Sequence, residues 1–263
     1  MADRFEPIAD LSGARILVSN DDGIDAPGIK LLERVAKTLS ADVWVVAPAS
    51  EQSAVAHSLT VRRPLRMLKV GRRRYAVDGT PTDSVLLGVR QLLNDKKPDL
   101  VLSGINRGGN LGEDVTYSGT VAAAMEGTLL GIPSIALSLQ INSDAAPRWA
   151  TAEHWAPGII KKLAAAGWQR NVLMNVNFPD VAADQVNGVA AARQGKRKIG
   201  DELVERTDPR GQPYYWIGGQ RLEDPGLSGT DLEAIHRGYV VVTPLGVDFT
   251  HDNTLAQMAA LFP

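Results

Sequence analysis

The hydrophobic positions of the chain fall into short apolar runs that alternate with longer stretches of helical period. Runs rich in β-branched residues predict buried strands at residues 16–18, 42–47, 100–102 and 135–139. Helices are predicted between and after them, at residues 26–39, 79–93 and 121–130. This repeated order of strand, polar loop and helix predicts an α/β fold, with a Rossmann-like, doubly wound, mostly parallel sheet in a three-layer core.

The pattern is weaker after residue 142. It still predicts helices at residues 149–166, 230–236 and 254–261, and strands at residues 172–178 and 239–243. Residues 186–219 favour extended hairpins with exposed aromatic side chains at Tyr214 and Trp216. Exposed aromatic residues are typical of an arm that packs against another subunit.

We expect three parts along the chain. Residues 1–14 show no period and predict a disordered or loosely docked extension. Residues 15–185 contain the predicted α/β core. Residues 186–263 contain a C-terminal β-hairpin arm, a returning strand and a terminal helix for oligomerisation.

Composition limits the kind of protein. The 263 residues are 44% hydrophobic and 22% charged, which is ordinary for a globular enzyme. A net charge of −2 argues against a nucleic-acid polymer as partner, and the absence of cysteine excludes disulfides and thiolate catalysis. The apolar runs are shorter than the roughly 20 residues that span a bilayer, and the first residues lack a signal-peptide pattern. We therefore expect a cytoplasmic protein with no membrane partner.

Polar side chains follow three of the predicted strands at the point where each strand ends. Asn20, Asp21 and Asp22 follow the first strand, Ser53 follows the second, and Asn106 lies in the glycine-rich segment after the third. The carboxyl ends of parallel strands meet at one edge of a sheet, where α/β proteins bind ligands. Two adjacent carboxylates repel each other unless a cation offsets them, and oxygen ligands suit Mg²⁺ or Mn²⁺.

A simpler interpretation of the first loop is a turn in which Asn20 and Asp22 cap the next helix and Gly23 supplies a positive φ. That interpretation leaves the other two polar loops at the same edge unexplained. The convergence of the three loops therefore favours a metal site, with Asp21, Asp22, Ser53 and Asn106 as its predicted ligands.

A second group of residues predicts an anion site. Ser118, Gly119 and Thr120 precede the helix at residues 121–130, so their backbone N–H groups lie at the positive end of a helix dipole. The predicted phosphate contacts are Asn20, Gly104, Asn110, Ser118, Gly119 and Thr120. The alternative is that Ser118 or Thr120 is only an N-cap of this helix.

A metal beside a phosphate site points to phosphoester hydrolysis. The ion would polarise a phosphoryl oxygen and lower the pKa of a bound water. Asp21 or Asp22 would orient that water or accept its proton, and Asn106 would stabilise charge on the phosphoryl oxygens. The sequence has no dinucleotide fingerprint, Walker A loop or nucleophile elbow. Of the four histidines, His57 is the one acid/base candidate, and we expect it to be a surface-loop residue.

Several motifs resemble those of one known family, the SurE (survival protein) 5′/3′-nucleotidases. They are SNDDG at residues 19–23, GTPTD at residues 79–83, SGIN at residues 103–106, YSGTVAAAMEG at residues 117–127 and GYVVVTPL at residues 238–245. The resemblance runs from about residue 15 to the C-terminus. One departure is Ala54, where many members have glycine after the serine ligand.

The resemblance implies a cytoplasmic phosphatase that hydrolyses nucleoside 5′- and 3′-monophosphates and, in some members, short-chain polyphosphate. It implies one divalent metal ion per subunit, Mg²⁺ or Mn²⁺, held by Asp21, Asp22, Ser53 and Asn106. It also implies that the C-terminal arm builds homodimers or homotetramers. The alternatives are a metal-dependent phosphatase of another small phosphoester, such as a sugar phosphate, and a non-catalytic nucleotide-binding sensor. The complete ligand set argues against the sensor.

Overall fold

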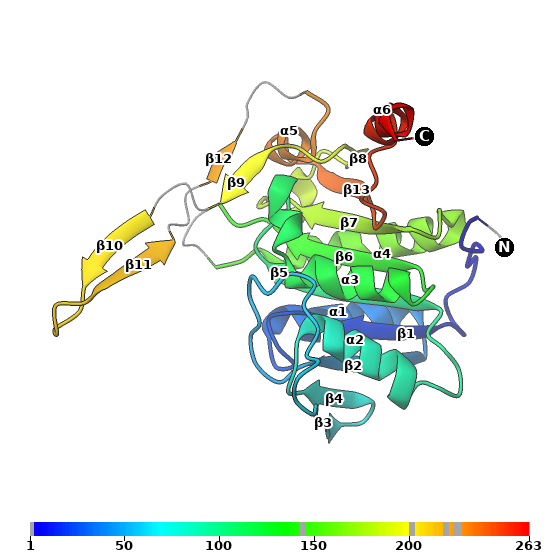
Figure 1. Ribbon diagram of the computed structural model, residues 1–263. Helices are drawn as coiled ribbons and strands as arrows, with labels where there is room; N and C mark the ends of the chain where they lie inside the picture. The colour runs from blue at the N-terminus through cyan, green and yellow to red at the C-terminus, as the bar shows by residue number, and fades with distance from the viewer. Residues whose placement is uncertain (1–2, 143–145, 200–202, 218–220, 224–227, 263) are drawn as a thin grey trace.

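A computed structural model describes residues 3–142, 146–199, 203–217, 221–223 and 228–262. The body of the protein is a nine-stranded sheet with the order β3-β4-β2-β1-β5-β6-β7-β13-β8 (Figure 1). Its parallel centre is formed by β1 (Arg15–Ser19), β2 (Asp42–Pro48), β5 (Leu100–Arg107), β6 (Ser134–Leu139) and β7 (Val172–Phe178). Outside this centre lie β4 (Arg74–Val77) and the edge strand β3 (Met67–Gly71) on one side, and β13 (Val240–Gly246) and the edge strand β8 (Val189–Ala191) on the other. The doubly wound, mostly parallel sheet is as predicted.

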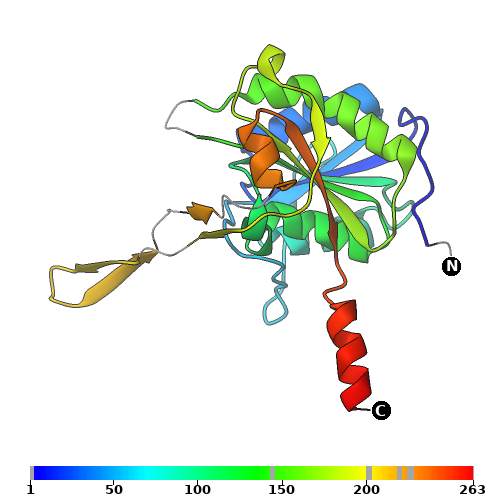
Figure 2. The ribbon, with the colours of Figure 1, turned by 90° about the horizontal axis from the view of Figure 1, so that it is seen from above.

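Helices cover both faces of the sheet and make the three layers (Figures 1 and 2). On one face α1 (Pro27–Leu39) and α4 (Trp149–Ala166) pack over the larger apolar core. On the other face lie α2 (Pro81–Leu87), its π-helical continuation η1 (Gly88–Leu92) and α3 (Gly119–Leu129). The predicted helix at residues 149–166 is confirmed, although Pro157 lies inside it.

The N-terminal segment is docked on the body. Phe5 and Leu11 are only 4% and 5% exposed and belong to the larger core. The backbone N–H of Phe5 donates to the carbonyl of Trp168 at 2.8 Å, and the two rings meet edge to face. The prediction of a disordered or loosely docked extension is therefore wrong for residues 3–14, because their apolar side chains complete the core.

The C-terminal part returns to the sheet and also leaves it. The strands β8 and β13 belong to the main sheet, where β13 pairs antiparallel with β7. Between them, β9 (Arg197–Ile199) pairs with β12 (Arg221–Glu223), and β10 (Leu203–Thr207) pairs with β11 (Pro213–Ile217). Figure 2 shows the β10-β11 hairpin reaching away from the body, and Trp216 is 65% exposed.

Short elements complete the chain. They are η2 (Gly112–Thr116), η3 (Ala183–Gln185), α5 (Asp231–His236) and α6 (Asp252–Leu261). The terminal helix α6 has no buried residue and extends from the body (Figure 2). Within the described part of the chain, no helix combines the length and the apolar character that crossing a membrane requires.

Candidate functional site

A cavity of about 530 Å³ opens at the carboxyl ends of the central strands. The four predicted metal ligands, Asp21, Asp22, Ser53 and Asn106, all line it. They come from three separate stretches of the chain, which the parallel order of β1, β2 and β5 brings to one edge. The structure thus brings together the residues that the strand ends predicted.

Asp21 is the most enclosed of these ligands, with 6% of its surface exposed. Burial raises the pKa of Asp21 to about 6, the Thr120 hydrogen bond opposes this rise, and the charge of Asp22 adds to it. The hydroxyl of Thr120 donates to Oδ1 of Asp21 at 2.5 Å. A divalent cation in the cavity would favour the charged form of this carboxylate, since it supplies the missing positive charge.

Burial also raises the pKa of Asp22, the neighbouring residue. The backbone N–H of Arg107 opposes this rise with a long contact to Oδ2 at 3.4 Å, whereas the charge of Glu51 adds to it. Glu51 lines the same cavity. With Asp114, four carboxylates therefore line this cavity, which makes it favourable for a cation.

Asn106 lies on a strand rather than in a loop. The sequence predicted that the third strand ends at residue 102, but β5 continues to Arg107. Gly104 permits this, because it has a φ of +132° and a Cβ there would lie 2.2 Å from the carbonyl oxygen of Leu137. The side-chain Nδ2 of Asn106 donates to the carbonyl of Gly108 at 2.9 Å, which leaves Oδ1 of Asn106 for a metal ion.

Ser53 lies in the segment of residues 49–58, here called the Ser53 loop. Its hydroxyl donates to Oε1 of Glu51 at 2.7 Å, so its lone pairs remain for a cation. Backbone bonds fix the loop on both sides, from Gln52 to Asp21 at 2.8 Å and from Ala56 to Tyr117 at 3.2 Å. Ala54 has a φ of +56°, which explains why glycine suits this position.

The donor set fits a hard divalent cation. Two carboxylates, one hydroxyl and one amide oxygen line the cavity, and Mg²⁺ and Mn²⁺ prefer oxygen ligands of these kinds. Among the described residues, no group of three or more histidine, cysteine, aspartate or glutamate side chains could hold a metal ion. A site in this cavity would therefore depend on the serine and asparagine oxygens as well as on the aspartates.

The N-terminus of α3, predicted as a phosphate cradle, is occupied by the protein itself. The hydroxyl of Ser118 accepts a hydrogen bond from the backbone N–H of Val121 at 3.1 Å, which is the N-cap alternative. A Cβ on Gly119 would lie 2.6 Å from Cβ of Asp21, so α3 packs directly against that carboxylate. The helix dipole therefore acts on Asp21.

The predicted phosphate contacts divide into two groups. Asn110 and Ser118 line the cavity. The residues that do not line it are Asn20, Gly104, Gly119 and Thr120. In this structure Thr120 bonds Asp21, and Asn20 donates to the carbonyl of Gly23 at 2.9 Å. A phosphate contact of these four residues stays a prediction.

In the simpler interpretation of the first loop, the positive φ of Gly23 is confirmed at +98°, but capping of the next helix by Asn20 or Asp22 is wrong. The N-cap of α1 is Ala26, and no side chain accepts a hydrogen bond from the first turn. Ala26, Pro27 and Gly28 line the cavity instead. The N-terminus of α1, which is the positive end of its helix dipole and has no side-chain cap, therefore lies at the cavity. The sequence predicted the N-terminus of α3 for this role.

Other lining residues were not predicted. They are Glu51, Arg107, Asp114, Tyr117 and Trp149. The only feature of the sequence that could have indicated Arg107 is its position directly after Asn106. Trp149 begins α4 and is far from the other lining residues in the sequence. His57 does not line this cavity, and its Nε2 lies 3.0 Å from Oε2 of Glu126 on α3.

Fold and cavity together define the class of this protein, a doubly wound α/β protein with an acidic, oxygen-lined cavity at the carboxyl edge of its sheet. The family model described as survival protein SurE matches residues 16–201, which is more than half of the chain. The chain therefore belongs to the SurE family.

Relatives with curated names cover nearly the whole chain. A protein of Paramagnetospirillum magneticum named 5′-nucleotidase SurE is 66% identical over 258 residues, which are 98% of this chain and 99% of that protein. A protein of Rhodospirillum rubrum with the same name is 55% identical and covers 98% of this chain and 100% of its own. The crystal structure of the SurE protein from Aquifex aeolicus has a TM-score of 0.83 and 43% identity, over 95% of this chain and 100% of that one.

Proposed function

We propose that this protein is a divalent-metal-dependent phosphatase that hydrolyses nucleoside 5′-monophosphates, with 3′-monophosphates as further substrates. The observation that carries the proposal is the presence of Asp21, Asp22, Ser53 and Asn106 in one cavity. The names of the relatives at 66% and 55% identity support the same activity. We propose one Mg²⁺ or Mn²⁺ ion per subunit, since both ions take these oxygen ligands.

The side chains of the cavity have separate roles in this proposal. When bound, the divalent ion supplies a Lewis acid and lowers the pKa of a coordinated water. Asp22, which is less enclosed than Asp21, accepts a proton from the attacking water. Arg107, the basic residue among the described lining residues, attracts the phosphate dianion into an otherwise acidic cavity.

Asn106 serves as a ligand through its Oδ1. One hydrogen of its Nδ2 donates to the carbonyl of Gly108, and the second hydrogen remains for a phosphoryl oxygen. Arg107 and the open N-terminus of α1 lie at the cavity and carry positive charge or potential. Asn110 and Ser118 complete the polar wall.

Two aromatic side chains favour a nucleoside over a sugar as the leaving group. Trp149 and Tyr117 line the same cavity as the aspartates. A Cβ on Gly28 would lie 3.3 Å from Cη2 of Trp149, so the glycine leaves room for the indole beside α1. Stacking of one base on an aromatic side chain contributes about 1–3 kcal/mol.

The substitution Trp149→Ala tests this preference. For adenosine 5′-monophosphate we expect KM to rise about tenfold, in line with the loss of one stacking contact, whereas KM for ribose 5-phosphate should change little. Trp216→Ala on the exposed hairpin is the matched control. Equal losses for both substrates would favour the sugar-phosphate alternative.

Phosphate release from a panel of nucleotides, with Mn²⁺ and with a chelator, tests the function itself. We expect release that needs the metal. Metal-dependent nucleotide binding without release would support the sensor, and release from sugar phosphates alone would support the other phosphatase. The same panel with short-chain polyphosphate tests that activity, which stays a prediction, as do the cytoplasmic location and the division at residue 186.

We propose a homodimer or homotetramer that uses the C-terminal elements. Both faces of β11 are exposed, with Tyr215 at 61% on one and Trp216 at 65% on the other, and α6 has no buried residue. Such apolar surfaces are usually covered by a partner. Replacing residues 203–217 by a short linker should reduce the mass that light scattering measures. An unchanged mass would contradict the role of the hairpin.

A further inference from the structure

Arg197 is a charged residue that the fold buries almost completely. It is the first residue of β9, at the base of the arm, and its side chain is only 2% exposed. Removing a guanidinium group from water is strongly unfavourable unless partners compensate its charge. The identity of these partners therefore shows which parts of the protein Arg197 holds together.

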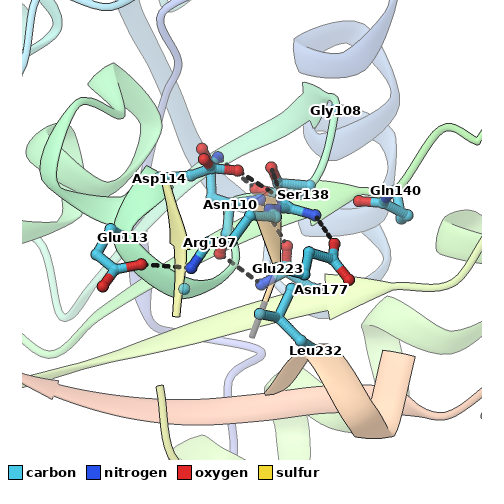
Figure 3. A network of polar contacts seen from close by, with 12 residues as sticks. Gly108, Asn110, Glu113, Asp114, Ser138, Gln140, Asn177, Arg197, Glu223 and Leu232 are labelled. Atoms are coloured by element: carbon cyan, nitrogen blue, oxygen red, sulfur yellow. Dashed lines mark hydrogen bonds and ion pairs between the residues drawn. The ribbon is translucent and has the colours of Figure 1, made fainter. Parts of the chain in front are cut away.

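The partners come from two other elements (Figure 3). The guanidinium Nη2 pairs with the buried carboxylate of Asp114 on η2, and Nη1 lies 3.2 Å from Oε1 of Glu223 on β12. The backbone N–H of Arg197 donates to the carboxylate of Glu113, also on η2. Both strands at the base of the arm are thus fixed to η2 through one residue.

The segment that Arg197 holds forms part of the cavity wall. Asp114 and Gly109 line the cavity, whereas Arg197 itself does not. The guanidinium Nη2 also lies 3.5 Å from the carbonyl oxygen of Gly109. A Cβ on Gly112, which has a φ of +54°, would lie 3.0 Å from the backbone nitrogen of Arg197. The strand β9 therefore packs directly on the back of the wall.

Backbone hydrogen bonds continue from this wall to the Ser53 loop. The N–H of Tyr117 donates to the carbonyl of Asp114 at 3.0 Å. The carbonyl of Tyr117 accepts from the N–H of Ala56 at 3.2 Å, and Ala56 belongs to the loop that carries Ser53. A displacement of Asp114 would therefore reach both the substrate side and the ligand side of the cavity.

We propose that Arg197 is a positioning residue of the phosphatase site, an inference that rests on the proposed function. Its ion pair with Asp114 fixes the wall at residues 109–117, so the shape of the cavity depends on the base of the arm. Glu223 extends the connection, because its Oε2 lies 2.7 Å from Nε2 of His236 on α5. A displacement of the base of the arm would then also displace the cavity wall.

Substitution of Arg197 tests the proposal. Arg197→Met keeps much of the length of the side chain but removes the guanidinium group that pairs with Asp114. We expect KM for adenosine 5′-monophosphate to rise about tenfold, which is typical when a residue that orients the binding groups is lost. The Kd for Mn²⁺ should rise as well. Arg197→Lys keeps the charge but loses the two-pronged geometry, so a smaller increase of about threefold is expected. Arg90→Met, at an exposed position of η1 away from the cavity and the arm, is the matched control and should change neither constant.

The measurements separate positioning from a merely structural role. If Arg197 only stabilised the fold, both variants would have a lower Tm and less active protein, with KM and the Kd for Mn²⁺ unchanged. That result would overturn the proposal. If Arg197→Met does not fold, Arg197→Lys decides by the same two constants. A wild-type protein that releases no phosphate disproves the proposed function, whereas unchanged Mn²⁺ affinity in folded variants, measured by electron paramagnetic resonance, disproves the role of Arg197.

Discussion

Two of the proposed metal ligands, Asn106 and Ser53, lie in different kinds of structure, a strand and a loop. Asn106 lies on β5, where its backbone pairs with Ser138 of β6, and its side-chain amide is fixed by Gly108. Ser53 lies in an exposed loop beside Ala54, whose φ of +56° is unfavourable for a residue with a Cβ. The cavity thus combines a ligand built into the sheet with one that depends on a loop. Substitutions should separate these contributions.

The largest effect should come from Asp22→Asn, which removes a negative charge from the cavity that Asn106 and Ser53 also line. The substitution is nearly isosteric, so the fold should persist while the metal loses a charged partner and the water loses its base. We expect kcat/KM for adenosine 5′-monophosphate to fall about 1000-fold, within the range for groups that act on developing charge.

Asp25→Asn is the matched control for this substitution. The Asp25 side chain is 89% exposed and lies 3.8 Å from Lys30, so its loss should leave kcat/KM unchanged. Circular dichroism of both variants shows whether the fold persists. Wild-type turnover of Asp22→Asn at saturating Mn²⁺ would remove Asp22 from the site.

The two ligands themselves should differ in how much metal affinity they contribute. Asn106→Ala removes an oxygen that the sheet holds in place, and we expect the Kd for Mn²⁺ to rise about 10- to 100-fold. Ser53→Ala removes a hydroxyl oxygen on an exposed side chain, and a rise of less than about tenfold is expected because fixing that side chain offsets part of the gain. Isothermal titration with Mn²⁺ measures both.

Controls for this pair are Asn94→Ala and Ser50→Ala, at exposed positions that do not line the cavity. Neither should alter the Kd for Mn²⁺. A larger loss for Ser53→Ala than for Asn106→Ala would reverse the comparison, since it would mean that the loop is as well ordered as the strand.

The smallest effect should come from Ala54→Gly. Glycine removes the strain of the left-handed backbone, about 1–2 kcal/mol, but adds roughly 0.5–1 kcal/mol of chain entropy to the unfolded state. We expect a net stabilisation of about 0.5 kcal/mol in urea unfolding. Ala49→Gly, at a residue of the same loop without positive φ, should instead be destabilising. Destabilisation by both changes would show that Ala54 is not strained.

The sheet was predictable wherever its signal was local. The end of β1 is marked by the change from apolar residues to Asn20, Asp21 and Asp22, and the ligand positions follow from the rule for parallel strands. The end of β5 was predicted too early, because Gly104 suggests a loop. It is instead the residue that lets β5 approach Leu137 of β6, a contact between segments about thirty residues apart.

The rest of the site depends on long-range packing. Trp149 reaches the cavity because α4 packs beside α1, and Gly28 is required because a Cβ there would clash with the carbonyl oxygen of Ile105 on β5. The burial of Arg197 could not be predicted, because the residue lies in a stretch of basic residues that resembles an exposed surface. It is buried only when β9 packs on η2. The docking of Phe5 against Trp168 is of the same kind, since neither residue predicts the other.

Anomalous diffraction from crystals grown with Mn²⁺ tests the central claim most directly. The account predicts one manganese peak per subunit within about 2–2.5 Å of oxygens from Asp21, Asp22, Ser53 and Asn106. A cavity without a peak at saturating Mn²⁺, or a peak held by other residues, would contradict it.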